Sequence, residues 1–123
     1  MEQKQNIPEI FSTITKYFSP KIIGEVNDVY VKLAKVKGQD VPWHIHDNED
    51  ELFYVIKGSL TMEIKGRNSF DLAEGELFIV KQGIEHRVYC EEECWLILVE
   101  NKDTKHTGDV KSQITKSVDE QRY

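Results

Sequence analysis

The sequence lacks the features that mark membrane, secreted and nucleic-acid-binding proteins. Its apolar runs, such as residues 77–80 and 95–99, are far shorter than the ~20 residues of a membrane-spanning helix. Residues 1–6 are polar, and the apolar segment of a signal peptide does not follow them. The net charge is −6, and no cluster of Lys or Arg provides a basic surface for nucleic acid. We therefore expect a soluble, cytoplasmic protein that binds neither a membrane nor nucleic acid.

Cysteine is also scarce, and its pattern gives little sign of redox or zinc chemistry. Cys90 and Cys94 are four positions apart and form no CxxC pair, so a structural zinc site is not indicated. In a cytosolic chain we expect both thiols to be reduced, with Cys94 packed in the core. A disulfide across a predicted turn at residues 91–93 is the alternative.

The length of 123 residues indicates a single domain, within which the pattern distinguishes three stretches. The first, residues 1–20, is predicted to be a partly helical, partly extended arm. Asn6 can cap a short helix that ends before Pro20. The apolar residues of this helix share one face at helical spacing, namely Ile7, Ile10, Phe11 and Ile14.

The second stretch, residues 21–100, has the two-residue period of β-strands. Apolar and polar residues alternate in short segments that are separated by glycine-containing turns. This pattern favours an all-β domain, either a sandwich or a barrel. The expected strands are residues 29–37, 41–47, 52–57, 60–65, 69–73, 76–80, 86–91 and 94–100.

The third stretch, residues 101–123, is polar and has little periodicity. We expect a surface arm or tail, in which His106 is exposed to solvent. An arm that crosses onto a second subunit is the alternative.

The other three histidines fall where strands can bring them together. His44 and His46 are two residues apart on one predicted strand, so their side chains share a face. Glu51 opens the next strand, and His86 begins a distant one. Non-adjacent strands of a small barrel can point at one interior spot. Three imidazoles and a carboxylate that meet there suit a divalent transition-metal ion.

The spacing of these residues resembles the two signatures of the cupin superfamily. The first run reads Gly38-x5-His44-x-His46-x4-Glu51-x6-Gly58 and matches the first signature at all five fixed positions. The second run reads Gly75-x5-Lys81-x-Gly83-x2-His86-x3-Cys90. It matches the second signature at both glycines and the histidine, but has Lys81 and Cys90 where proline and asparagine are usual.

The resemblance implies a double-stranded β-helix, or jelly-roll barrel, over residues 21–100. It also implies that His44, His46, Glu51 and His86 bind a divalent transition-metal ion. The identity of the metal stays open among Fe, Mn, Ni and Zn. The departures from the signatures touch no ligand.

Two other interpretations of the polar residues stay open. Glu49 or Asp50 could replace Glu51 as the carboxylate, although the interval from Glu51 to Gly58 favours Glu51. The four predicted ligands could instead be solvated side chains at strand edges.

Strand parity predicts the surroundings of the site. The residues that share the inward faces would line a mostly apolar pocket for a small-molecule ligand, and they are Phe53, Val55, Val88 and Cys90. The faces that point away from the pocket are also apolar and need a cover, which together with the resemblance favours a homodimer. These outward residues are Ile45, Leu52, Tyr54 and Ile56.

The cupins that this chain resembles include dioxygenases and isomerases as well as proteins that only bind a ligand. We expect a metal-dependent enzyme of dioxygenase or isomerase type that acts on a small organic metabolite. The alternative is a non-catalytic metal-binding, small-molecule-binding or sensing protein. Phosphorylated sugars are disfavoured because arginine occurs only at Arg67, Arg87 and Arg122. A general base is not evident, and Tyr30, Lys32 and Lys35 qualify only if their strand turns them inward.

Overall fold

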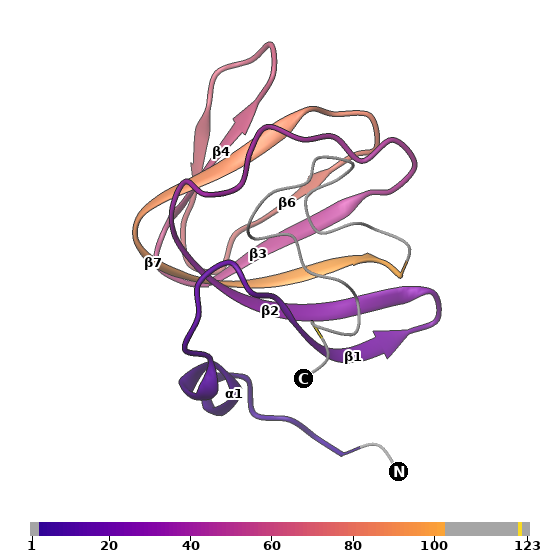
Figure 1. Ribbon diagram of the computed structural model, residues 1–123, viewed down its shortest axis with the longest axis vertical. Coiled ribbons are helices and arrows are strands. Elements are labelled where there is room, and N and C mark those ends of the chain that lie inside the picture. Colours follow the sequence, from indigo (N-terminus) through magenta and orange to yellow (C-terminus); the bar gives the residue numbers. More distant parts are fainter. Residues whose placement is uncertain (1–2, 103–120, 122–123) are drawn as a thin grey trace.

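The computed structural model describes residues 3–102 and residue 121, and its strands curve around a shared interior (Figure 1). The predicted all-β class with one short N-terminal helix is confirmed. In the described part of the chain, no helix is long and apolar enough to span a membrane. The elements are α1 (Ile7–Thr13), β1 (Lys21–Val26), β2 (Val29–Gly38), β3 (Glu51–Lys57), β4 (Leu60–Ile64), β5 (Phe70–Leu72), β6 (Leu77–Val80) and β7 (His86–Asn101).

Strands that are distant in the sequence are neighbours in the sheet. The antiparallel order is β1-β2-β7-β3-β6, and β4 pairs with both β5 and β7. The strand β7 therefore joins β2 to β3 and also carries the β4–β5 hairpin. This arrangement brings residues from the middle and the end of the described chain to one interior.

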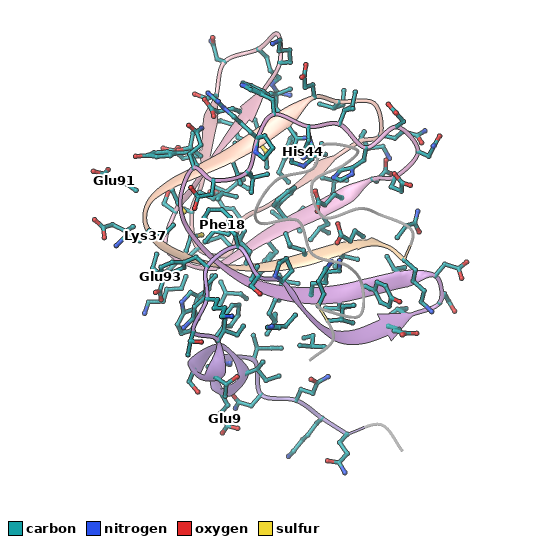
Figure 2. The ribbon with its side chains drawn as sticks, viewed as in Figure 1. Glu9, Phe18, Lys37, His44, Glu91 and Glu93 are labelled. Carbon is teal, nitrogen blue, oxygen red and sulfur yellow. The ribbon has the colours of Figure 1, made fainter. Side chains whose placement is uncertain are left out.

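The prediction of two strands, residues 86–91 and 94–100, with a turn between them is wrong. The strand β7 is continuous over these residues. Its first residues, 86–89, pair with β4, whereas residues 94–101 pair with β2. Glu91 and Glu93 lie where the partner changes, and their side chains point outward from the bend (Figure 2). Both cysteines flanking this bend are free and buried, so the alternative of a disulfide is wrong.

Gly58 allows the turn between β3 and β4 to pass close to this bend. Its φ is +91°, a left-handed conformation that glycine adopts without steric cost. A Cβ atom at this position would lie 2.7 Å from the backbone oxygen of Glu93. The glycine at position 58 thus has a physical reason in this fold, since a larger residue would push β7 away.

The predicted strand at residues 41–47 is also wrong, because this segment is an extended loop with a single β-bridge between His44 and His86. Pro42 has no backbone N–H to donate to a ladder, which disfavours a continuous strand there. The expected alternation of inward and outward side chains is nevertheless present. His44 and His46 are buried, whereas Asp47 is exposed.

The N-terminal arm packs onto the barrel from outside and then enters it. Asn6 Oδ1 accepts a hydrogen bond of 2.9 Å from the Glu9 backbone N–H, so the predicted cap is present. On α1, Phe11 stacks on Trp95 with ring centroids 4.6 Å apart. Farther on, Phe18 is 3% exposed and joins the interior core with a φ of +53°, a strained conformation for an aromatic residue.

The helix α1 partly covers the outer face that was expected to be open. Ile10, Phe11 and Ile14 form a buried cluster with Leu33, and Ile56 packs against this cluster. The apolar outward side chain of Ile56 is therefore covered by the chain itself rather than left for a second subunit.

Candidate metal centre

The four predicted ligands come from three places that the fold brings to one interior point. Glu51 is the first residue of β3 and His86 the first of β7, whereas His44 and His46 lie on the loop between β2 and β3. All four are buried. One potential ligand atom from each residue lies within 4.8 Å of the ligand atoms of the other three.

Backbone hydrogen bonds fix the loop that carries two of these histidines. His44 and His86 exchange two N–H···O bonds of 3.0 Å each, which hold the loop against the start of β7. The Gly83 N–H donates to the His46 carbonyl at 2.9 Å. These three backbone hydrogen bonds hold the loop at the site.

Two of the imidazoles are oriented by carbonyl groups two residues before them. The Nδ1 atom of His44 lies 2.9 Å from the Pro42 carbonyl oxygen, and that of His86 lies 2.9 Å from the Ile84 carbonyl oxygen. A carbonyl only accepts, so in the neutral form of each ring Nδ1 carries the proton and Nε2 has the lone pair. A hydrogen bond from the second ring nitrogen to a backbone carbonyl is typical of metal-binding histidines.

The distances at the centre fit an ion better than they fit direct hydrogen bonds. Glu51 Oε1 lies 3.5 Å from His46 Nε2 and 3.7 Å from His86 Nε2. Donors bonded at about 2.1 Å to one ion and separated by 90–110° lie about 3.0–3.5 Å apart. Among residues 3–102 and 121, no hydrogen-bond partner reaches the buried Nε2 atoms of His46 and His86. A divalent cation would satisfy both nitrogens.

The charge states at neutral pH are those that a cation needs. Burial, assisted by the nearby His86, lowers the pKa of His44 to about 4, so this imidazole is neutral. Burial alone would raise the pKa of Glu51, but the neighbouring His46, His86 and Glu100 side chains hold it well below its usual range. Neutral imidazole and ionised carboxylate are the metal-binding forms of these groups.

A small apolar cavity of about 40 Å³ adjoins this cluster. Of the four predicted lining residues, Phe53 and Val88 line it, whereas Val55 and Cys90 are buried in the core beside it. Burial raises the pKa of the Cys90 thiol to about 11, which makes it inert at neutral pH. The remaining walls are Phe18, Pro20, Ala34, Val36, Val41, His44, Glu51, Leu96 and Leu98.

The alternative carboxylates do not join the cluster. Asp50 is instead exposed, with one oxygen 2.7 Å from Lys81 Nζ and the other accepting from the Gln82 N–H at 2.9 Å. Lys81, which stands where the cupin signature usually has proline, thus ties two loops together beside the site. His106 lies outside the described residues.

The sequence alone does not determine which side chains of β2 point into the barrel. Tyr30 and Lys32 are buried and face the interior, whereas Lys35 lies on the outside with its Nζ 5.2 Å from the Trp95 ring centroid. Lys32 Nζ makes an ion pair of 2.5 Å with Glu100, which lies opposite Glu51 in the sheet. Glu100 was not singled out from the sequence, although its even spacing from His86 along β7 placed it on the inward face.

The chain matches the Cupin domain family over residues 33–100, more than half of its length, and it belongs to that family. All four clustered residues lie inside this match. The uncharacterized protein YdbB of Bacillus subtilis (strain 168) is 32% identical over 87 residues, which cover 71% of this chain and 76% of YdbB.

Solved structures share the fold. A cupin-2 domain protein from Shewanella frigidimarina NCIMB 400 is 34% identical, with a TM-score of 0.76 over 80% of this chain and 94% of that chain. Hydroquinone 1,2-dioxygenase from Sphingomonas sp. TTNP3 is 14% identical, with a TM-score of 0.66 over 79% of this chain and 72% of that chain. The second likeness establishes the fold alone.

Proposed function

We propose that this cupin is a metal-dependent enzyme of dioxygenase or isomerase type that acts on a small organic molecule. His44, His46, Glu51 and His86 would hold one divalent transition-metal ion. The observation that carries this proposal is the pair of buried Nε2 atoms on His46 and His86. Neither atom has a hydrogen-bond partner in the described part of the chain, and both face the same Glu51 oxygen. Leaving such groups unsatisfied in a folded interior is costly unless a cation binds them.

Four protein ligands leave up to two positions open on an octahedral ion. An ion of this kind polarises a carbonyl or enediolate oxygen, or brings O2 and an organic substrate together. The chain itself supplies the apolar walls, which exclude water and strengthen electrostatic interactions at the site.

The walls define the class of substrate. Apart from His44 and Glu51, every residue that lines the cavity is apolar. Arg87 lies outside it, with Nε 2.6 Å from Glu63 Oε2, and Arg67 lies over the Phe70 ring. Because neither arginine is available to bind a phosphate there, we infer a mainly apolar substrate whose polar atoms meet the metal ion.

A non-catalytic metal-binding or sensing role is the second candidate, and the size of the cavity favours it. About 40 Å³ holds no more than a few water molecules, so an organic ligand fits only if a wall moves. Phe18, which enters from the N-terminal arm, is a wall residue that lies outside the helix and the strands.

The test begins with elemental analysis of the protein purified without added metal. We expect about one transition-metal ion per chain, and we expect the His46→Ala variant to lose it while His106→Ala retains it. O2 uptake by the anaerobically prepared Fe(II) protein, measured with a panel of small phenols, keto acids and diketones, tests the dioxygenase. Isomerisation of small hydroxy-carbonyl compounds by the Mn(II) protein tests the isomerase. Metal binding without turnover of any compound would favour the sensor.

We also propose a homodimer that packs through the part of the outer face that α1 leaves open. Leu77 and Ile79 on β6 are 52% and 44% exposed. They pair with Tyr54 and Leu52 on β3, so the four side chains form one apolar patch. Light scattering at micromolar concentration should give twice the chain mass, and a Leu77→Lys/Ile79→Lys variant should give the monomer mass.

A further inference from the structure

The loop of residues 39–50 carries two of the four predicted ligands, yet it belongs to no strand. In the described part of the chain its backbone forms one β-bridge, between His44 and His86. The end of the loop is tied to Lys81 and Gln82 by Asp50. The half that precedes His44 is held by side chains on the outer side of the barrel.

The β-bridge places Trp43 opposite Arg87. In an antiparallel pair, the residue before His44 faces the residue after His86. Successive side chains of extended backbone point to opposite faces, so these two residues lie outside the barrel when the histidines lie inside. The two side chains are in contact, because Arg87 Cζ lies 4.6 Å from the centroid of the Trp43 ring. Both residues are half-buried.

Glu63 on β4 holds this arginine from its other side. It lies directly opposite Arg87 in the ladder between β4 and β7. Arg87 Nε donates to Glu63 Oε2 at 2.6 Å, and Arg87 Nη2 lies 3.5 Å from Glu63 Oε1. The same Oε2 atom accepts a hydrogen bond of 2.7 Å from Gln39 Nε2, where the loop begins. One carboxylate therefore links β4, β7 and the start of the histidine loop.

We propose that Arg87, held by Glu63, is a positioning residue that keeps Trp43 and the histidine loop against β7. His44 then faces His86 across the metal centre. The inference rests on the proposed function, since it assumes that both histidines are ligands. A cation over an aromatic ring contributes modestly at a partly exposed site. The expected effect is therefore a several-fold change in metal affinity and not the loss of the site.

The experiment compares Arg87→Met with a matched control, Arg67→Met. Arg67 Cζ lies 5.0 Å and 5.8 Å from the ring centroids of Phe70 and Phe78. Each variant thus removes one positive charge and one contact between a guanidinium group and a ring, but only R87M removes a contact to the histidine loop. The full chain is stripped of metal, and its affinity for Zn²⁺ is measured by competition with a chromophoric chelator. The absorption spectrum of the Co²⁺ form reports the ligand set.

The charge of Arg87 and its contact with the loop predict opposite results. Removing a positive charge would, by charge alone, strengthen the binding of a cation, whereas a loosened loop would weaken it. We expect R87M to bind Zn²⁺ about 3–10-fold more weakly than the wild type, with an altered Co²⁺ spectrum. R67M should stay within about twofold of the wild type, because its contact does not involve the loop and exposed charges are screened by salt.

Substitutions of Trp43 test whether the ring itself is what Arg87 holds. Trp43→Phe keeps an aromatic face for the cation and should bind Zn²⁺ within about twofold of the wild type. Trp43→Leu keeps apolar bulk without that face and should lose affinity about as much as R87M. Adding R87M to W43L should change the affinity by less than about twofold, since the contact is already absent.

Three results would overturn the inference while leaving the proposed function intact. They are a smaller loss or a gain of affinity in R87M, an equal loss in R87M and R67M, and additive losses in R87M and W43L. Urea denaturation should show each variant folded, and Arg87→Gln replaces R87M if the latter is not. If the wild-type protein binds neither Zn²⁺ nor Co²⁺, the proposed function fails and this inference fails with it.

Discussion

The same three strands line two different halves of the barrel interior. In one half, the inward residues of β2, β3 and β7 are apolar, as with Val36, Val55 and Leu96. In the other half, the inward residues of these strands are Lys32, Glu51 and Glu100. Burial alone therefore does not distinguish the halves. The apolar half supplies hydrophobic stabilisation, whereas the polar half carries buried charges beside the predicted ligands.

Removing a predicted ligand from the polar half should affect metal binding more than any change in the apolar half. His86→Ala should lower Zn²⁺ affinity by at least about 100-fold, because it deletes an imidazole that is already oriented by the Ile84 carbonyl. Chelator competition measures the loss. An affinity within threefold of the wild type would show that the cluster is not the metal site.

Shortening a side chain in the apolar half should lower the free energy of unfolding and leave Zn²⁺ affinity nearly unchanged. Leu96 is 1% exposed, so Leu96→Ala should lower the free energy of unfolding by about 2–5 kcal/mol through lost burial and the cavity left behind. Urea denaturation of the metal-free protein measures this. Zn²⁺ affinity at a temperature where the variant is folded should change less than threefold, and a larger change would mean that the two halves are coupled.

Acid should weaken the metal-free protein through the polar half. The pKa of His44 is about 4 in the folded chain, below its ordinary 6.5. Between these values the unfolded chain binds a proton that the folded chain does not, so stability is highest above pH 6.5 and falls as the pH decreases. The loss should be about 2 kcal/mol at pH 5. Urea titrations at pH 7 and pH 5 measure it, and His44→Asn should remove most of the difference.

The smallest effect concerns Phe18, where the N-terminal arm enters the interior. Both Phe18→Ala and Phe18→Gly remove the ring, but only glycine adopts a φ of +53° without strain. Phe18→Gly should therefore be more stable than Phe18→Ala by about 1 kcal/mol, as measured by urea denaturation. The reverse order would show that the left-handed conformation at this residue is not retained in solution.

The proximity of the four clustered residues could be predicted because it depends on spacing and strand parity. His44 and His46 share a face in an extended segment whether or not that segment is a regular strand, so the error at residues 41–47 did not alter their placement. Glu51 and His86 each open a strand, and strand starts are marked by the turns before them. These signals are local, and the fold preserves them.

The features that were missed depend on contacts between distant segments. The run Glu91–Glu93 resembles a turn because it is acidic, yet β7 stays extended there since β4 and β2 pair with it in succession. Lys32 and Glu100 each look like ordinary strand charges, and only their pairing across the sheet makes them a buried ion pair. The entry of Phe18 into the barrel has no periodic signal at all.

The position of β7 in the chain also determines when the molecule can close. Until this strand leaves the ribosome, the described chain offers only separate pieces, namely β1 with β2, β3 with β6, and β4 with β5. These pieces are joined through β7, which carries His86 at its first residue and Glu100 near its last. A nascent chain that ends before residue 86 therefore has neither a closed barrel nor all four of the predicted ligands.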